Sequence, residues 1–340
     1  MDAELNFPHD SELYEHHRLT VDKGQEPMRV DIYLTNQISG LSRTKIKIAS
    51  EIELVRVNNK PVKVSYKIKP NDEITVLLPF PPQFTEIIPQ PIPLDIVYED
   101  EFLLIVNKPA GMVVHPAYGN WKDTLVNGLL YHCNNLQSVQ KESPRPGLVH
   151  RIDKNTSGLL VVCKTEFSMM HLSKQFFEHS VERKYHALVW GSFPQQTGTI
   201  NAPLGRNPND RKTMAVVSPE NGKNAVTHFS VIKDFTYTSL IECTLETGRT
   251  HQIRAHMNYL RHPVFNDKSY GGNSILKGPN DGTYRTFVEK CFNFLPSQAL
   301  HAKTLGFIHP VTGKNMFFES QWTEGFSKLI TAWEKNCLIF

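Results

Sequence analysis

Short apolar runs bounded by polar, glycine or proline residues recur through the C-terminal three quarters of the chain, and they predict β-strands. Residues 103–106 (LLIV) and 159–163 (LLVVC) are uninterrupted apolar runs, typical of strands that are buried on both faces. Residues 185–189 (YHALV) predict a third strand. Residues 241–246 alternate between apolar and polar positions, which predicts a strand whose inward face is formed by Ile241, Cys243 and Leu245.

Two segments show the longer period of a helix. Residues 165–180 predict one helix. Residues 250–256 begin a second, in which Arg254 lies on a different side from the apolar face formed by Ile253, Met257 and Leu260. Strands dominate between these segments, and the helices do not alternate with them regularly. The pattern therefore favours an α+β fold with a mixed, mainly antiparallel sheet over a doubly wound fold.

The N-terminal part predicts a separate, small α/β domain over residues 28–78. Two short helical patterns, the second capped by Ser42, are followed by short apolar strands. Turn-forming residues at 58–61 and 70–72 join these strands.

Charge and proline content mark the domain boundaries. Residues 1–27 carry seven acids against two bases, a balance of −5 that predicts a mobile tail. Residues 28–78 reverse the sign, with nine bases against five acids. Six prolines within residues 79–93 predict a semi-rigid linker. The large domain is then expected over residues 94–322, followed by a C-terminal segment, residues 323–340.

Composition restricts the class of protein. With 340 residues and 40% apolar content, the chain is long enough for a large domain with its own core and a small one. Its start lacks the pattern of a secretory signal, and no apolar run approaches the roughly 20 residues that span a bilayer, so no membrane association is expected. Five cysteines without a Cys-x-x-Cys pair favour a reducing cytoplasm over a disulfide framework.

No metal site and no cofactor are expected. His251 and His256 are five residues apart, rather than the four that align two ligands on one helical face. The sequence contains no Gly-x-Gly-x-x-Gly motif after a strand and no phosphate-binding Gly-Lys-Ser/Thr loop. The reaction should therefore need only protein and substrate.

Candidate chemistry is concentrated in residues 146–160 (PGLVHRIDKNTSGLL). In an extended segment Arg151 and Asp153 project to one side, while His150 and Ile152 project to the other. A turn is predicted at residues 156–158, and the strand that follows would anchor the loop. A scaffold presents a catalytic group in this way, although a surface ion pair beside a turn has the same pattern.

The segment HRIDKNTSGLL resembles the signature of the RluA family of pseudouridine synthases. Further blocks follow in that family's order over roughly residues 94–322, namely residues 97–100 and 104–116, 182–189, 245–256, and 298–302 with 306–310. The resemblance implies a pseudouridine synthase fold, which agrees with the α+β pattern.

The resemblance implies roles for individual residues. Asp153 matches the family's catalytic aspartate, and Arg254 matches the cation that pairs with it; Arg249, ranked second for this pair, could bind a phosphate instead. Tyr185 matches an active-site tyrosine that stacks against the uracil. Arg151 is expected to occupy the gap left by a uridine that leaves its helix, or to hold the flanking phosphate.

The small domain resembles the αL module of a small-subunit ribosomal protein. The resemblance is partial, because residues 50–53 stand where such modules often have a glycine. It implies RNA contact through a basic helix bearing Arg43, Lys45 and Lys47, whereas the alternative is a solvated basic face. In the large domain, Asn266 stands where the family commonly has glycine, and no role is assigned to an insertion at residues 273–295.

These features predict an RNA pseudouridine synthase that acts on large-subunit ribosomal RNA; a synthase that acts on transfer RNA is an alternative. One alternative is a noncatalytic RNA-binding or ribosome-assembly protein that retains the fold. Another is a carboxylate-dependent glycosidase, but such enzymes use two carboxylates, and Asp153 has no acidic partner within its motif. The sequence identifies neither the target uridine nor the oligomeric state.

Overall fold

The computed structural model describes residues 14–38, 43–51, 53–78, 87–116, 122–133, 145–210 and 212–336, together with Asn120 and Leu136. The chain divides into two compact units, Met1–Glu86 and Ile87–Phe340. Each unit has its own apolar core. The expected linker at residues 79–93 spans this division, and its first eight residues lie outside the described part.

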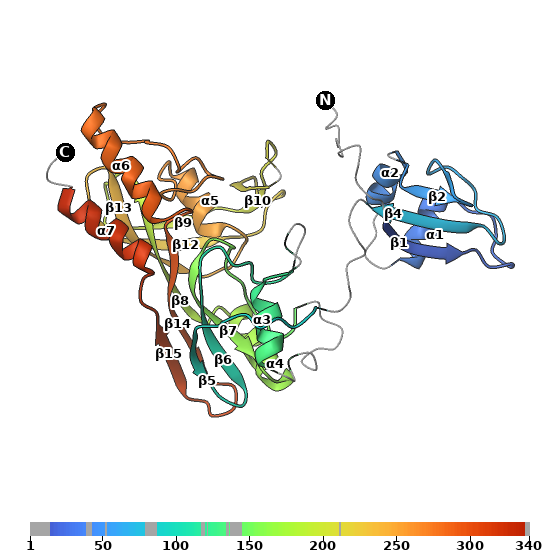
Figure 1. Cartoon of the computed structure of the whole chain (residues 1–340), viewed down its shortest axis with the longest axis horizontal. Coiled ribbons are helices and arrows are strands. Elements are labelled where there is room, and N and C mark those ends of the chain that lie inside the picture. The colour runs from blue at the N-terminus through green and yellow to red at the C-terminus, as the bar shows by residue number, and fades with distance from the viewer. Residues whose placement is uncertain are drawn as a thin grey trace. The chain divides into compact units, whose positions relative to one another are not determined.

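The N-terminal unit pairs two helices with a small antiparallel sheet (Figure 1). Its elements are β1 (Tyr14–Thr20), α1 (Val30–Gln37), α2 (Arg43–Glu51), β2 (Val55–Val57), β3 (Lys60–Pro61) and β4 (Glu73–Leu78). The strand order is β1-β4-β2-β3. A tight turn joins β2 to β3 through Asn58 and Asn59, which both adopt positive φ, as hairpin turns of this length require.

The predicted mobile tail is wrong for the described residues before Met28. β1 pairs with β4 from Tyr14 opposite Leu78 to Thr20 opposite Glu73. Val21, which follows it, is buried in the core of the unit. The acidic composition of this segment concealed the strand, because backbone pairing with β4 does not depend on side-chain charge. The α/β unit therefore begins before residue 28.

The C-terminal unit is built on one large sheet (Figure 1). Its strands are β5 (Ile96–Glu99), β6 (Leu103–Lys108), β7 (Ser157–Cys163), β8 (Glu182–Trp190), β9 (Thr197–Asn201), β12 (Val226–Asp234), β13 (Thr238–Leu245), β14 (Leu300–Ile308) and β15 (Asn315–Glu319). They lie in the order β5-β6-β7-β14-β8-β13-β12-β9, with β15 also paired to β14. Every pairing among these described strands is antiparallel except that of β7 with β14.

Helices and a small hairpin complete this unit. They are α3 (Leu125–His132), α4 (Glu166–Phe177), α5 (Gln252–Tyr259), α6 (Gly282–Phe294), α7 (Glu324–Asn336), and the hairpin of β10 (Leu204–Arg206) and β11 (Met214–Val216). The insertion at residues 273–295 contains α6, which packs against α7. Both helices bury side chains in the main core, among them Tyr284 and Trp333. The compact unit therefore continues past the expected boundary at residue 322.

The α+β fold and the main elements of the sheet agree with the sequence pattern. The predicted strands correspond to β6, β7, β8 and β13, and the predicted helices to α4 and α5. Along β13, Ile241, Cys243 and Leu245 are buried, as the alternation indicates.

The turn predicted at residues 156–158 lies two residues earlier. Lys154 and Asn155 form the turn, and β7 already begins at Ser157. Ser157 and Gly158 pair in parallel with His301 and Ala302 of β14. Gly158 has φ of +111°, and a Cβ there would collide with the carbonyl of Ala302. Glycine is needed here for close strand approach rather than for a turn.

Candidate active site

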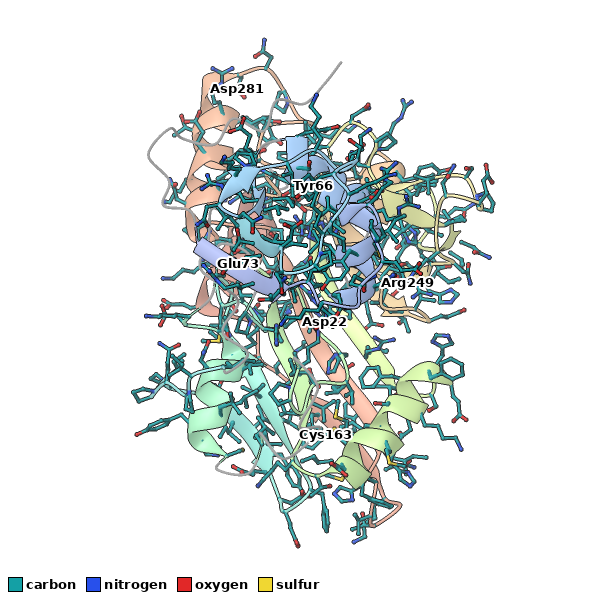
Figure 2. The ribbon with its side chains drawn as sticks, turned by 90° about the vertical axis from the view of Figure 1, so that its right-hand side faces the viewer. Asp22, Tyr66, Glu73, Cys163, Arg249 and Asp281 are labelled. Carbon is teal, nitrogen blue, oxygen red and sulfur yellow. The ribbon has the colours of Figure 1, made fainter. Side chains whose placement is uncertain are left out.

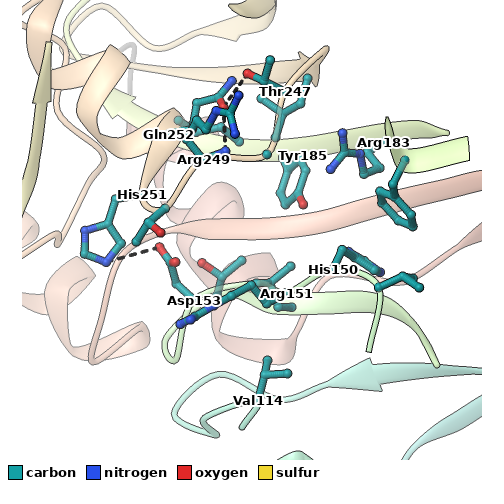
Figure 3. Close-up of a pocket in the computed structure, with 18 of the residues that line it drawn as sticks. Val114, His150, Arg151, Asp153, Arg183, Tyr185, Thr247, Arg249, His251 and Gln252 are labelled. Carbon is teal, nitrogen blue, oxygen red and sulfur yellow. Dashed lines mark hydrogen bonds and ion pairs between the residues drawn. The ribbon is translucent and has the colours of Figure 1, made fainter. Parts of the chain in front are cut away.

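A cavity of about 770 Å³ opens on the C-terminal unit (Figure 3). Its lining comes from the motif loop (residues 145–156), the C-terminal end of α4, β8, and the segment that leads from β13 into α5. Among the described residues that line it, Asp153 is the only carboxylate. The arginines among them are Arg254 and four others, namely Arg145, Arg151, Arg183 and Arg249. Such a cavity suits an anionic ligand.

The motif loop shows the alternation that the sequence predicts. Ile152 is buried in the main core, and Arg151 is exposed at the cavity. His150 stacks on Phe176 of α4 with ring centroids 4.6 Å apart, and its Nε2 accepts the N–H of Val161 at 3.1 Å. Burial lowers the pKa of His150 to about 3, so the ring is neutral. The inward side chains thus anchor the loop to β7 and α4.

Asp153 is paired with Arg254, which lies on α5. Arg254 Nη1 donates to Asp153 Oδ2 at 3.0 Å. The same guanidinium donates to Asp267 twice, through Nε at 2.6 Å and Nη2 at 2.8 Å. Arg254 and Asp267 are both buried. A bidentate pair fixes the plane of the guanidinium, so its remaining edge is directed at Asp153.

The charge of Arg254 is strongly favoured. Burial by itself would lower the pKa of Arg254, but the hydrogen bonds and charges of Asp267 and Asp153 raise it above its usual value. The guanidinium also lies 5.0 Å from the centre of the Tyr270 ring. Sequence reasoning missed Asp267 and Tyr270, although both stand in the segment that contains Asn266. Asn266 itself adopts a φ of 60°, which asparagine tolerates better than most residues.

His251 is a second neighbour of Asp153 that the sequence did not nominate. Its Nε2 lies 3.9 Å from Asp153 Oδ2, and its Nδ1 lies 3.2 Å from the hydroxyl of Tyr270 (Figure 3). It precedes α5 in the left-handed region, with φ of 54°. Burial lowers the pKa of His251, although Asp153 opposes the shift. The sequence analysis considered this residue only as a metal ligand. Its position three residues before Arg254 was the signal that could have placed it in the site.

Tyr185 lies on β8, between Cys243 of β13 and Ala302 of β14. Its ring is buried in the main core and lines the cavity above the motif loop in Figure 3. Burial raises the pKa of Tyr185, Asp153 adds to the shift, and Arg183 opposes it. The phenol is therefore protonated at neutral pH.

The two other arginines nominated from the sequence lie at the cavity without pairing to Asp153 in the described structure. Arg151 is exposed on the motif loop. Arg249 donates through Nε to the carbonyl of Asn224 at 3.0 Å, and its backbone N–H donates to Gln252. The geometry thus brings Arg254, and not Arg249, to the carboxylate. Arg183 was not nominated; its guanidinium lies 5.1 Å from the centre of the Phe176 ring.

Lys108 supports the site from behind. Its side chain is fully buried, and its ammonium donates to the carbonyls of Pro109 at 2.8 Å, Met112 at 2.9 Å and Lys154 at 3.0 Å. Burial lowers the pKa of Lys108 to about 7, although Asp153 opposes the shift. By joining the end of β6 to the turn after Asp153, Lys108 fixes the backbone of the motif loop.

The basic residues nominated in the N-terminal unit belong to α2. Arg43 lies 3.4 Å from the buried carboxylate of Asp31, which is also paired with Arg29 at 3.0 Å. Lys47 is exposed and lies 3.8 Å from Glu51 one turn later. Part of the charge of this helix therefore stabilises the unit itself. The side chain of Lys45 and the whole of Ser42 lie outside the described part.

One group of described residues has the composition of a metal site. Atoms of Glu99, His132 and Cys133 lie within 4.8 Å of one another. However, Glu99 accepts from Lys164 at 2.7 Å through one oxygen and contacts His132 at 2.8 Å through the other. A lysine ammonium thus already neutralises the carboxylate.

None of the described helices is both long and apolar enough to cross a membrane.

The sequence matches the family model described as RNA pseudouridylate synthase over residues 102–259. A protein of Bacillus subtilis named as an RNA pseudouridine synthase is 43% identical over 318 residues, which cover 94% of this chain and 98% of that protein. The chain belongs to the RNA pseudouridine synthase family. A relative in Zymomonas mobilis, named ribosomal large subunit pseudouridine synthase D, is 46% identical over 297 residues, which cover 86% and 90% of the two chains.

The synthase also shares its fold with solved structures. The human RNA pseudouridylate synthase domain containing 4 matches with a TM-score of 0.52 and 20% identity, over 70% of this chain and 92% of that one. As a pseudouridine synthase, the protein is an isomerase that acts on RNA. Asp153, Tyr185, His251 and Arg254 all lie within the segment that matches the family model.

Proposed function

We propose that this synthase isomerises uridines of large-subunit ribosomal RNA and that Asp153 is its catalytic carboxylate. The observation that carries the proposal is the position of Asp153, which lines an open cavity and accepts a 3.0 Å hydrogen bond from a buried arginine. A carboxylate that acts as a nucleophile or base must be charged, and an adjacent guanidinium favours that state.

The reaction is an isomerisation that needs no cofactor. The bond between uracil N1 and ribose C1′ breaks, the base turns, and C5 bonds to C1′; C5 loses a proton and N1 gains one, so the atoms balance. Asp153 would act beside C1′ or on the ring, while Arg254 and Asp267 hold it in place. Tyr185, on the opposite wall, offers a buried aromatic face for the uracil and a protonated phenol for proton transfer.

The target uridine has to leave its helix, because a glycosidic bond within a stack is inaccessible to a side chain. A cavity of about 770 Å³ has room for a nucleotide. Arg151, exposed beside Asp153, would fill the gap in the RNA or bind the flanking phosphate. Arg249 would contribute a second phosphate contact at the opposite wall.

Two observations support ribosomal RNA as the substrate. The relatives from Zymomonas mobilis and Neisseria meningitidis are named as large-subunit synthases, and this chain covers 90% and 81% of them. The N-terminal unit adds a helix with exposed basic residues, such as Lys47, which would contact the RNA backbone. Transfer RNA is the competing substrate.

The test is a tritium-release assay on ribosomal RNA labelled at uracil C5, without nucleotide or metal. The wild-type protein should release tritium, and Asp153→Ala should not. Glu334→Gln, which removes an exposed pair with Lys233, is the matched control and should retain full activity.

Four results would contradict parts of the proposal. Full activity of Asp153→Ala would exclude the aspartate as catalyst. Release from transfer RNA alone would exclude the ribosomal substrate. Free uracil in place of pseudouridine would indicate a glycosidase, and RNA binding without release from either RNA would indicate a noncatalytic protein.

A further inference from the structure

Helix α4 carries three exposed apolar side chains on its outer face, one of which, Phe167, also contacts the ring of His171. Its inner face buries Met169 and Leu172 against β7 and its neighbours. On the outer face, Phe167 is 50% exposed, Met170 72% and Phe177 83%. We call these three residues the α4 stripe. Figure 2 shows side chains standing out from this helix on the side away from the sheet.

The three residues of the stripe share one side of the helix, with the exposed Lys174 between Met170 and Phe177 on that side. Residues 167, 170 and 177 lie within one third of the helix circumference at 100° per residue. Ten residues of helix extend about 15 Å, which corresponds to several stacked nucleotides. Lys174, between Met170 and Phe177, pairs with Glu178 at 3.7 Å, so the acid next to Phe177 is neutralised.

The stripe leads into the cavity that contains Asp153. Phe177 and the nearby His179 line that cavity, whereas Met170 and Phe167 lie about two and three turns farther away. Phe176 is turned inward between His150 and Arg183. His150 belongs to the motif loop, so the end of α4 is attached to the segment that carries Asp153. A ligand whose target group reaches Asp153 would therefore pass Phe177.

Charge indicates which ligand covers the stripe. The cavity walls carry four arginines besides Arg254, and Asp153 is the only carboxylate among the described lining residues. This sign and density favour a polyanion over an apolar protein surface. Exposed aromatic rings beside arginines are the usual means of binding unpaired bases, because every base has a π-face and the phosphates are matched by the cations.

We propose that Phe177 is a stacking platform for an unpaired base next to the target uridine, and that Met170 and Phe167 extend this platform along the strand. The inference rests on the proposed function, in which a uridine enters the cavity. Removing the uridine from its helix leaves a neighbouring base without a stacking partner. Phe177 replaces that partner, and Arg151 then takes the second of its two proposed roles, binding the flanking phosphate. The platform selects targets whose flanking nucleotides are single-stranded.

The first measurement is RNA binding in the full-length protein, with a uridine hexanucleotide that carries one 2-aminopurine as the probe. Stacking on Phe177 changes the fluorescence of this base. Phe177→Ala and Phe177→Leu should each weaken binding on the order of tenfold, whereas Phe177→Trp should bind the RNA as wild type does. Phe317→Ala is the matched control, because this phenylalanine is 60% exposed on β15 and is not among the lining residues; it should bind as wild type does.

The second measurement is turnover of ribosomal RNA. Phe177→Ala should raise KM about tenfold and leave kcat within about twofold, because the platform binds flanking bases and not the reacting one. Unchanged binding and KM in Phe177→Ala would overturn the inference. Full function of Phe177→Leu would do the same, because leucine retains apolar contact without a ring.

The remaining outcomes separate this inference from the proposed function. If wild type releases tritium and Phe177→Ala has the same KM, only the platform fails. If Asp153→Ala is fully active, the catalytic assignment fails, while the fluorescence result still decides the platform. Sedimentation velocity tests whether a second copy of the chain binds the α4 stripe instead of RNA. A wild-type dimer that becomes monomeric in Phe177→Ala would assign the stripe to a second copy and overturn the inference.

Discussion

At the scale of single residues, the site depends on one arginine that joins two carboxylates. Asp267 is fully buried and binds Arg254 in bidentate fashion, whereas Asp153 receives one hydrogen bond from the free edge of the guanidinium. In the proposed function, Asp267 is thus a positioning residue, which acts on the reaction through Arg254. Lysine could not replace this arginine, because a point charge cannot hold two carboxylates in one plane.

Asp267→Asn should lower kcat about 100-fold with little change in KM. The amide keeps one acceptor oxygen and presents an NH2 donor to the other N–H of Arg254, so one hydrogen bond is lost and the other is weakened. Small displacements of a catalytic group cost this much. Tritium release over a range of RNA concentrations measures the two constants. If circular dichroism shows that the variant is unfolded, the loss of activity would indicate a structural role instead. Arg254→Lys should show the same loss of kcat as Asp267→Asn.

His150 should make the protein sensitive to acid. Its pKa in the folded protein is about 3, below the ordinary value of 6.5, so between these values the unfolded chain binds the extra proton. The free energy of unfolding therefore falls as pH is lowered from 6.5 towards 3, and His150 contributes up to about 2 kcal/mol of the loss between pH 7 and 5. Urea unfolding of wild type and His150→Gln at both pH values measures this contribution; an equal loss in the two proteins would contradict it.

At the scale of elements, the join between β7 and β14 determines where Asp153 lies. The two strands pair in parallel at Ser157 and Gly158, directly after the motif loop. β6 pairs with the other edge of β7, and Lys108 at its end binds the carbonyl of Lys154. The loop is therefore held by strands on both sides.

Gly158→Ala should destabilise the protein by about 3 kcal/mol or more. A Cβ at this position meets the backbone of Ala302, and the φ of +111° is strained for any L-residue with a side chain. Gly282→Ala is the control, because a Cβ there meets nothing within 4 Å and alanine favours the helix that begins at this residue. Thermal unfolding compares the three proteins; equal transition temperatures would refute the close-approach argument.

At the scale of the whole molecule, the chain consists of two units with separate cores. The described residues that line the candidate active site all belong to Ile87–Phe340. In the proposed function, the N-terminal unit contributes by binding RNA, through exposed cations such as Lys47.

Replacing Lys45 and Lys47 together by glutamine should raise KM for ribosomal RNA and leave kcat unchanged. The loss of two phosphate contacts reduces the slope of log KM against log salt by about 1.4 to 1.8. Tritium release at several salt concentrations measures the slope. Lys328→Gln, which removes an exposed cation from α7 in the other unit, is the control; an equal effect of this change would show that the basic helix has no special role.

Much of the fold could be predicted because its signals are local. The apolar runs of β6 and β7 and the alternation of β13 depend only on which faces are buried. The turn was predicted at the wrong position and β1 was not predicted, because both depend on contacts with strands that are distant in the sequence. Gly158 is needed because another strand passes close by, and β1 is ordered by β4, about 60 residues later in the chain. A single stretch of sequence contains no record of such a partner.

The residues of the candidate site also fall into two groups, those that motifs predict and those that only the structure identifies. Asp153, Tyr185, Arg254 and Arg151 were nominated because they stand in motifs, and their chemical roles stay predictions. Asp267 and His251 stand beside the same motifs, but only their hydrogen bonds and distances distinguish them from ordinary polar residues. The α4 stripe has no motif; it is evident only from the exposure of Phe177 at the mouth of the cavity.

The sequence by itself determined the α+β class and membership in a family, because periodicity and the order of motifs are properties of the chain alone. The tertiary structure decided which residues meet. Strand order in the sheet does not follow chain order, and β14 lies between β7 and β8. This arrangement brings Asp153 to Arg254, 101 residues away, and so builds a site from segments that the chain keeps far apart.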